Sequence, residues 1–256
     1  DTVVTWESLD FQPYFTATAS NIGYGWWSHD IGGHMLGIRS DVMEARWYEL
    51  GTFSPINRLH STKMSFSGKE PWNFRPEVEH AMGEALRLRH QLLPYLYTMN
   101  YLAYKEYRPV IAPMYYDYPE KEQAYPVQDH SFVEGVSNNQ YLFGTDMIVA
   151  PITSDQIASL NQGKVKAWIP EGCYHDFFTG LIYKGEKVMW MFRGINSIPV
   201  LVKAGGIIPM QKELFGKDFL KNPEELIIRV YGGADGNYTH YEDDGCLLYT
   251  SPSPRD

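Results

Sequence analysis

The sequence predicts an α/β region followed by an all-β region, in the order expected for the end of an α/β barrel and an adjoining β-sandwich. Residues 1–110 alternate short strand-like runs with helical periodicity, whereas the residues after Pro109 form short β-type runs between Gly, Pro and Asp turns. We therefore expect the barrel end in 1–110, a β-sandwich in 111–211, and a linker with the start of a second β domain in 212–245.

Two short strands and two helices are expected before residue 61. Residues 8–20 are interpreted as loop and then helix, and residues 23–27 (GYGWW) as an aromatic strand bounded by glycines. Asp41 could cap a helix, because apolar residues recur at helical spacing over 42–50. Residues 54–60 are interpreted as a second short strand.

A long helix is expected next, because apolar residues continue at three- and four-residue steps from Val78 to Ala103. Pro76 suits the first turn of this helix, and Pro94 should kink it. The β-type runs that follow are residues 141–152, 165–169, 175–178, 198–209, 226–231 and 237–242.

Composition limits the classes of partner. The 256 residues carry a formal net charge of −9, which argues against nucleic acid and anionic membranes, and no run approaches the ~18 apolar residues of a membrane span. Aromatic residues make up 15% of the chain, which fits either stacking on sugar rings or a tyrosine-rich core. The two cysteines, Cys173 and Cys246, give neither a disulfide framework nor metal-ligand spacing.

Asp30 and His60 are candidate functional residues, because each comes at the end of a predicted strand. In an α/β barrel the carboxyl ends of the strands share one face, so the two side chains would point into one pocket. The alternative is structural, since an aspartate there can cap a helix and a histidine can be a satisfied core residue. A further alternative is a metal site formed by His29, Asp30 and His34, which His60 could join, although HDxxxH matches no standard ligand spacing.

The run from Trp26 to His34 (WWSHDIGGH) resembles the WWSHDIGG signature of glycoside hydrolase family 31. Further runs resemble the same family in the same order: residues 5–9 (TWESL), 51–60 (GTFSPINRLH), 143–151 (FGTDMIVAP) and 204–209 (AGGIIP). The resemblance covers nearly all of residues 1–245. It implies a retaining α-glycoside hydrolase whose (β/α)8 barrel is followed by proximal and distal C-terminal β domains.

The resemblance also implies site residues. Asp1 matches the general acid/base, which precedes the TWESL-like helix, and Asp30 and His60 match residues that hydrogen-bond sugar hydroxyls. Trp27 resembles an aromatic residue of the same pocket, and His34 takes a variable position near the leaving group. The family's nucleophile motif does not occur in this chain. A retaining mechanism needs two carboxyl groups, so we expect the chain alone to be inactive.

The implied activity is that of an exo-acting α-glucosidase. An α-xylosidase, an α-glucosyltransferase of the same family, a non-catalytic sugar-binding homologue and a metal-dependent hydrolase remain alternatives. The expected partner is a small α-glucoside or oligosaccharide, with no cofactor, metal, nucleic acid or membrane, and the oligomeric state stays open. We expect the chain to be the C-terminal part of a longer protein.

The last eleven residues, 246–256 (CLLYTSPSPRD), match the in-frame translation of a transposon-derived sequencing adapter. We therefore expect them to lie outside the biological sequence, and they are excluded from the fold argument.

Overall fold

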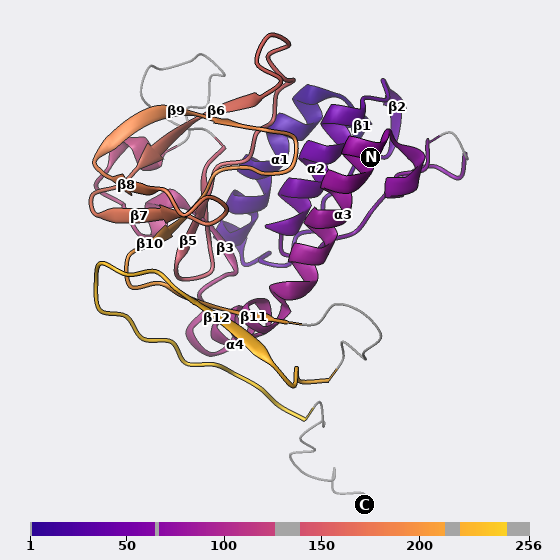
Figure 1. Cartoon of the computed structure of the whole chain (residues 1–256). Helices are drawn as coiled ribbons and strands as arrows, with labels where there is room; N and C mark the ends of the chain where they lie inside the picture. Colours follow the sequence, from indigo (N-terminus) through magenta and orange to yellow (C-terminus); the bar gives the residue numbers. More distant parts are fainter. Residues whose placement is uncertain (1, 65–66, 126–138, 213–220, 245–256) are drawn as a thin grey trace, which may run out of the picture.

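The computed structural model describes residues 2–64, 67–125, 139–212 and 221–244. The predicted adapter segment 246–256 and Asp1 lie outside the described residues. Helices α1 to α3 group on one side of the molecule, and most of the β-strands lie on the other (Figure 1). Within the described part of the chain, no helix is both long and apolar enough to cross a membrane.

The first region contains β1 (Val3–Val4), α1 (Trp6–Thr18), β2 (Met35–Gly37) and α2 (Asp41–Thr52). β1 and β2 pair in parallel across α1. Ile31 and Leu59 form a second parallel bridge across α2. Parallel pairing with an intervening helix is the connection found in α/β barrels, so the barrel-end prediction is confirmed at this level.

Helix α2 is buried over most of its length. Its N-cap is Ser40, not Asp41 as expected, and the Ser40 Oγ accepts a hydrogen bond from the Met43 amide at 3.3 Å. This bond satisfies one of the amides that lack an intrahelical partner. Every residue from Met43 to Thr52 is buried, including the charged Glu44, Arg46 and Glu49. Buried charges need partners, so α2 is where polar networks are expected.

The predicted long helix is two helices, α3 (Pro76–Gln91) and α4 (Leu93–Glu106). Leu92 separates them, and Pro94 stands at the start of α4, where its missing N–H costs no intrahelical hydrogen bond. The interruption that Pro94 predicts is therefore confirmed. Pro76 begins α3, also as expected.

The second region is built from antiparallel strands. A six-stranded sheet has the order β3-β4-β5-β10-β7-β8, a two-stranded sheet joins β6 to β9, and another joins β11 to β12. The strands are β3 (Ile111–Pro113), β4 (Tyr141–Phe143), β5 (Met147–Val149), β6 (Gly163–Ile169), β7 (Cys173–Asp176), β8 (Ile182–Lys184), β9 (Lys187–Arg193), β10 (Val200–Lys203), β11 (Ile207–Gln211) and β12 (Leu226–Val230). The apolar faces of this region and of the helices share one core.

Several expected elements differ from the structure. Residues 23–27 and 237–242 are not strands, and of residues 54–60 only Leu59 takes part in β pairing. A strand requires a partner strand for its hydrogen bonds, and among the described residues none pairs with 23–27 or 237–242. Conversely, β9 was not expected, although it pairs with β6 over seven residues.

Candidate functional site

Asp30, His34 and His60 come together beside the Ile31–Leu59 bridge. One side-chain ligand atom from each lies within 4.8 Å of the other two. His60 Nε2 is 3.9 Å from Asp30 Oδ1, and the His34 and His60 rings meet edge to face at 4.5 Å. Asp30 precedes the bridge residue Ile31 and does not follow a strand, whereas His60 follows Leu59 as expected. The three side chains are only partly buried, so a ligand can reach them.

The Asp30 carboxylate has several polar neighbours. Arg58 Nη2 lies 3.0 Å from Oδ1, and the Arg58 Nε donates to Ser28 Oγ at 3.3 Å. Burial alone would raise the pKa of Asp30, but His60, hydrogen bonds from Thr2 and the Arg58 charge together lower it. Asp30 is therefore ionised at neutral pH and can accept hydrogen bonds from hydroxyl groups.

The neighbouring histidine, His29, is held by a buried chain of hydrogen bonds that sequence reasoning did not identify. Trp47 Nε1 donates to His29 Nδ1 at 3.2 Å, and His29 Nε2 lies 2.8 Å from Ser54 Oγ, which donates to the Leu50 carbonyl at 2.7 Å. Because Nδ1 accepts, Nε2 carries the proton and donates to Ser54. Burial lowers the pKa of His29 to about 4, so the imidazole is neutral.

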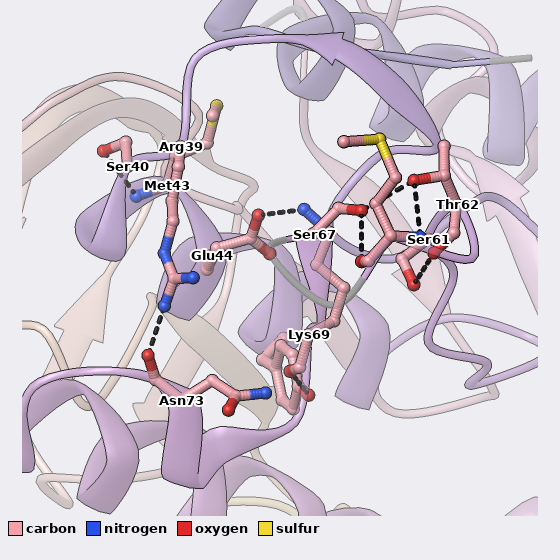
Figure 2. A network of polar contacts seen from close by, with 11 residues as sticks. Arg39, Ser40, Met43, Glu44, Ser61, Thr62, Ser67, Lys69 and Asn73 are labelled. Atoms are coloured by element: carbon pink, nitrogen blue, oxygen red, sulfur yellow. Dashed lines mark hydrogen bonds and ion pairs between the residues drawn. The ribbon is translucent and has the colours of Figure 1, made fainter.

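A buried ion pair lies beneath the loop that carries Asp30 and His34. Lys69 Nζ is 2.7 Å from Glu44 Oε1, and Figure 2 shows this pair next to Arg39, whose guanidinium donates to the Asn73 carbonyl. Gly32 has a φ of +87°, and a Cβ there would lie 2.4 Å from Glu44 Oε2. The loop can therefore pack this closely on the pair only with glycine at position 32.

Burial raises the pKa of Glu44 to about 7, and the Lys69 charge limits that rise. Tyr48, one turn further along α2, donates its hydroxyl to the Lys69 carbonyl at 2.5 Å. Helix α2 thus holds both the side chain and the backbone of Lys69. The lysine in turn supports the Gly32 turn from below.

The remaining expected residues are less closely connected to this cluster. The contacts of Trp27 are with Phe15 of α1, at 4.7 Å between ring centroids, and with Tyr24 at 5.9 Å. Asp1 lies outside the described residues. Its sequence neighbour Thr2 hydrogen-bonds Asp30 and accepts from the His34 amide at 2.7 Å through its carbonyl.

The cluster offers two imidazoles and one carboxylate, which is a donor set that transition metals accept. However, the Arg58 guanidinium already occupies Asp30 Oδ1 and adds a positive charge next to the three groups. That charge would oppose a cation bound at Asp30, although the carboxylate has further lone pairs to offer a ligand. The arrangement suits hydrogen bonding to a neutral hydroxylated ligand better than it suits a metal ion.

Two family descriptions match the chain. Residues 1–99 match "Glycosyl hydrolases family 31 TIM-barrel domain", and residues 107–208 match "Glycosyl hydrolase family 31 C-terminal domain". The boundary between them falls at the end of α4, where the helical region passes into the antiparallel strands.

Curated relatives and solved structures agree with these matches. The chain is 29% identical to an alpha-xylosidase of Saccharolobus solfataricus, covering 96% of the chain and 32% of the relative, and 25% identical to alpha-glucosidase 2 of Bacillus thermoamyloliquefaciens, covering 94% and 28%. It is similar to a cycloalternan-forming enzyme of Listeria monocytogenes solved with a pentasaccharide substrate, with a TM-score of 0.83, 26% identity, and coverage of 94% and 23%. The chain spans about a third or less of these proteins.

Proposed function

The chain belongs to glycoside hydrolase family 31, and we propose that it supplies the acid/base and sugar-contacting residues of a retaining α-glucosidase that releases glucose from non-reducing ends. The observation that carries this proposal is the cluster of Asp30, His34 and His60, in which an ionised carboxylate and two imidazoles lie within reach of one small ligand. Carboxylates and imidazoles are suited to bind the hydroxyl groups of a sugar.

In this proposal each residue has a distinct part. Asp30 accepts hydrogen bonds from two sugar hydroxyls, and His60 donates to or accepts from a third. His34 lies on the leaving-group side, and Trp27 forms part of the aromatic wall of the pocket. Asp1 donates a proton to the leaving oxygen and later removes one from water.

The retaining reaction also needs a nucleophilic carboxylate at ~5–5.5 Å from the acid/base. In the proposal that group comes from residues beyond this chain. The chain alone should then bind sugars but not hydrolyse them. Release of p-nitrophenol from p-nitrophenyl α-glucoside by the purified chain would contradict this.

The decisive assay uses the longer protein recovered from its gene, with maltose as substrate. Asp1→Ala should lower kcat about 10²- to 10⁴-fold, which is the usual contribution of a general acid/base. Asp30→Asn should lower kcat/KM about 10- to 150-fold, because a hydrogen bond to a charged group is worth about 1.5–3 kcal/mol. Unchanged activity in the Asp1 variant would refute the assignment.

An α-xylosidase is the second candidate, because an alpha-xylosidase is among the most similar curated relatives, at 29% identity. The same longer protein is assayed with p-nitrophenyl α-xyloside and isomaltose alongside maltose. A kcat/KM on the xyloside above that on both glucosides would replace the α-glucosidase proposal with this one.

A further inference from the structure

A second hollow lies between the helices and the C-terminal β region. This interface pocket has a volume of about 380 Å³, which falls within the ~300–1,000 Å³ of small-molecule sites. Helices α2 and α3 supply one wall, and the segments that follow β7 and β9, with Arg229 of β12, supply the other. Asp30, His34 and His60 are not among the described residues that line it, so it is separate from the site proposed above.

The outer part of the pocket carries an aromatic surface. The Phe178 side chain is 39% exposed, and its ring centroid lies 5.2 Å from that of Phe177. The fully buried Asp176 fixes the turn, because its Oδ1 accepts from the amides of Phe178 at 3.0 Å and Thr179 at 2.8 Å. These hydrogen bonds fix the backbone that carries the exposed Phe178 ring. An aromatic face of this kind can pack against the C–H face of a pyranose ring.

Glu49 lies at the inner wall. Its side chain is 5% exposed, and Oε2 accepts from Arg46 Nη1 at 2.8 Å. Its second oxygen, Oε1, is buried and has no hydrogen-bond partner among the described residues. A buried acceptor without a partner costs about 1–3 kcal/mol. A hydroxyl group that reaches this end of the pocket would remove that cost.

Glu49, Glu84 and Arg87 of the pocket are already in ion pairs, and Arg229 contacts Phe177. Arg87 pairs with Glu84 at 2.7 Å. Arg229 stacks over the Phe177 ring at 4.6 Å and donates to the Phe177 carbonyl at 3.3 Å. The charge of Glu49 is likewise opposed by Arg46. A charged ligand would have to compete with the Arg87–Glu84 and Arg46–Glu49 ion pairs, whereas a neutral ligand would not.

We propose that the interface pocket binds a neutral polyhydroxylated ligand, a monosaccharide or the terminal unit of an oligosaccharide, with a hydroxyl on Glu49 and a ring face on Phe178. Its size, its aromatic surface, its unpaired buried acceptor and the ion pairs of Glu49, Glu84 and Arg87 all fit this class. The site goes beyond the proposed hydrolysis and does not rest on it, because neither Glu49 nor Phe178 has a part in that reaction.

Saturation-transfer NMR with methyl α-D-glucopyranoside tests the proposal on the whole chain. The Asp30→Asn/His60→Ala double variant removes the hydroxyl contacts of the first site, so the signal that remains reports the interface pocket. In that background Phe178→Ser should weaken binding about tenfold or more, about 1.4 kcal/mol. Glu49→Gln, which is nearly isosteric, should also weaken it, because the amide presents a donor or a weaker acceptor to the hydroxyl.

Phe192→Ser is the matched control, since Phe192 is 38% exposed and does not line the pocket. It should leave the signal unchanged, and circular dichroism should show the same fold for all variants. Loss of all signal in the Asp30→Asn/His60→Ala background would overturn this proposal but would leave the proposed role of Asp30 and His60 standing. A signal that survives both Phe178→Ser and Glu49→Gln, or that 10 mM phosphate displaces, would overturn it as well.

Discussion

Replacing Arg46 with leucine should destabilise the chain by about 3–5 kcal/mol, because it removes one partner of a buried ion pair. The Arg46 side chain is fully buried. Its Nη1 donates to Glu49 Oε2 at 2.8 Å and to the Ser197 carbonyl at 3.0 Å, and its Nη2 donates to the Arg193 carbonyl at 3.2 Å. The guanidinium therefore joins α2 to the end of β9 and to the segment after it.

The magnitude follows from what the substitution leaves behind. The charged hydrogen bond to Glu49 is worth about 1.5–3 kcal/mol, and each of the two carbonyl bonds is worth about 0.5–1.5 kcal/mol. The Glu49 carboxyl, whose pKa burial already raises to about 7 despite Arg46, would lose the charge that stabilises its ionised form. Most domains have a stability of only ~5–15 kcal/mol, so this loss is large.

Urea denaturation at pH 8, followed by tryptophan fluorescence, measures the change in the free energy of unfolding. The Arg46→Leu/Glu49→Leu double variant should be less destabilised than Arg46→Leu, because it leaves no buried charge without a partner. Arg87→Ala is the control, since its pair with Glu84 is about half exposed and should be worth under ~1 kcal/mol. The reasoning fails if Arg46→Leu costs no more than this control, or if the double variant is the least stable.

Three further outcomes are expected. Because burial lowers the pKa of His29 from 6.5 to about 4, its contribution to stability is present above pH 6.5 and lost as the pH falls toward 4. The melting temperature of His29→Gln should therefore depend less on pH over that window than that of the wild type. Burial, with Lys69 opposing, raises the pKa of Glu44 from 4.5 to about 7, so its contribution is present below pH 4.5 and lost as the pH rises to 7. Glu44→Gln keeps this side chain uncharged at every pH, so the free energy of unfolding measured in urea should change less between pH 4.5 and 7 than that of the wild type. Gly32→Ala should cost about 2 kcal/mol or more in urea denaturation, whereas Gly23→Ala, which also has a positive φ but has open space around it, should cost only ~1 kcal/mol; equal losses would contradict the packing argument.

The helices could be predicted because their signals are local. Pro76 marks the start of α3 and Pro94 the interruption before α4, and each acts through its own missing N–H and fixed φ. The cap of α2 was misplaced by one residue, from Ser40 to Asp41. Both side chains can accept a hydrogen bond from the first turn, so only the backbone geometry separates them.

The strands were harder to predict, because a strand is defined by a partner that can be far away in sequence. Residues 23–27 have β propensity but no partner strand among the described residues, and they form no strand. β9 was missed because its residues do not alternate cleanly between buried and exposed, although β6 supplies it with a full ladder. Pairing information of this kind is absent from a single sequence.

In the candidate site, too, local sequence signals could be interpreted and contacts between distant residues could not. The motif that carries Asp30 and His34 marked both as candidates, and the structure brings His60 next to them, while their role stays a prediction. The hydrogen bonds of His29 and the ion pair between Arg58 and Asp30 were not predicted, because neither a tautomer nor an ion pair can be inferred from residue type alone. The available signal for Arg58 was its place two residues before His60, which puts both side chains near one loop.

Helix α2 connects the two sites through opposite faces. At 3.6 residues per turn, Glu44 and Trp47 lie within ~60° of each other, and Arg46 and Glu49 form a similar pair about 160° away. The first pair holds Lys69 and His29 under the Asp30 loop, and the second pair holds the C-terminal region and lines the interface pocket. A shift of α2 along or about its axis would therefore move both sets of contacts at once. Because each set contains a buried ion pair, which tolerates little displacement, α2 is held in position from both sides.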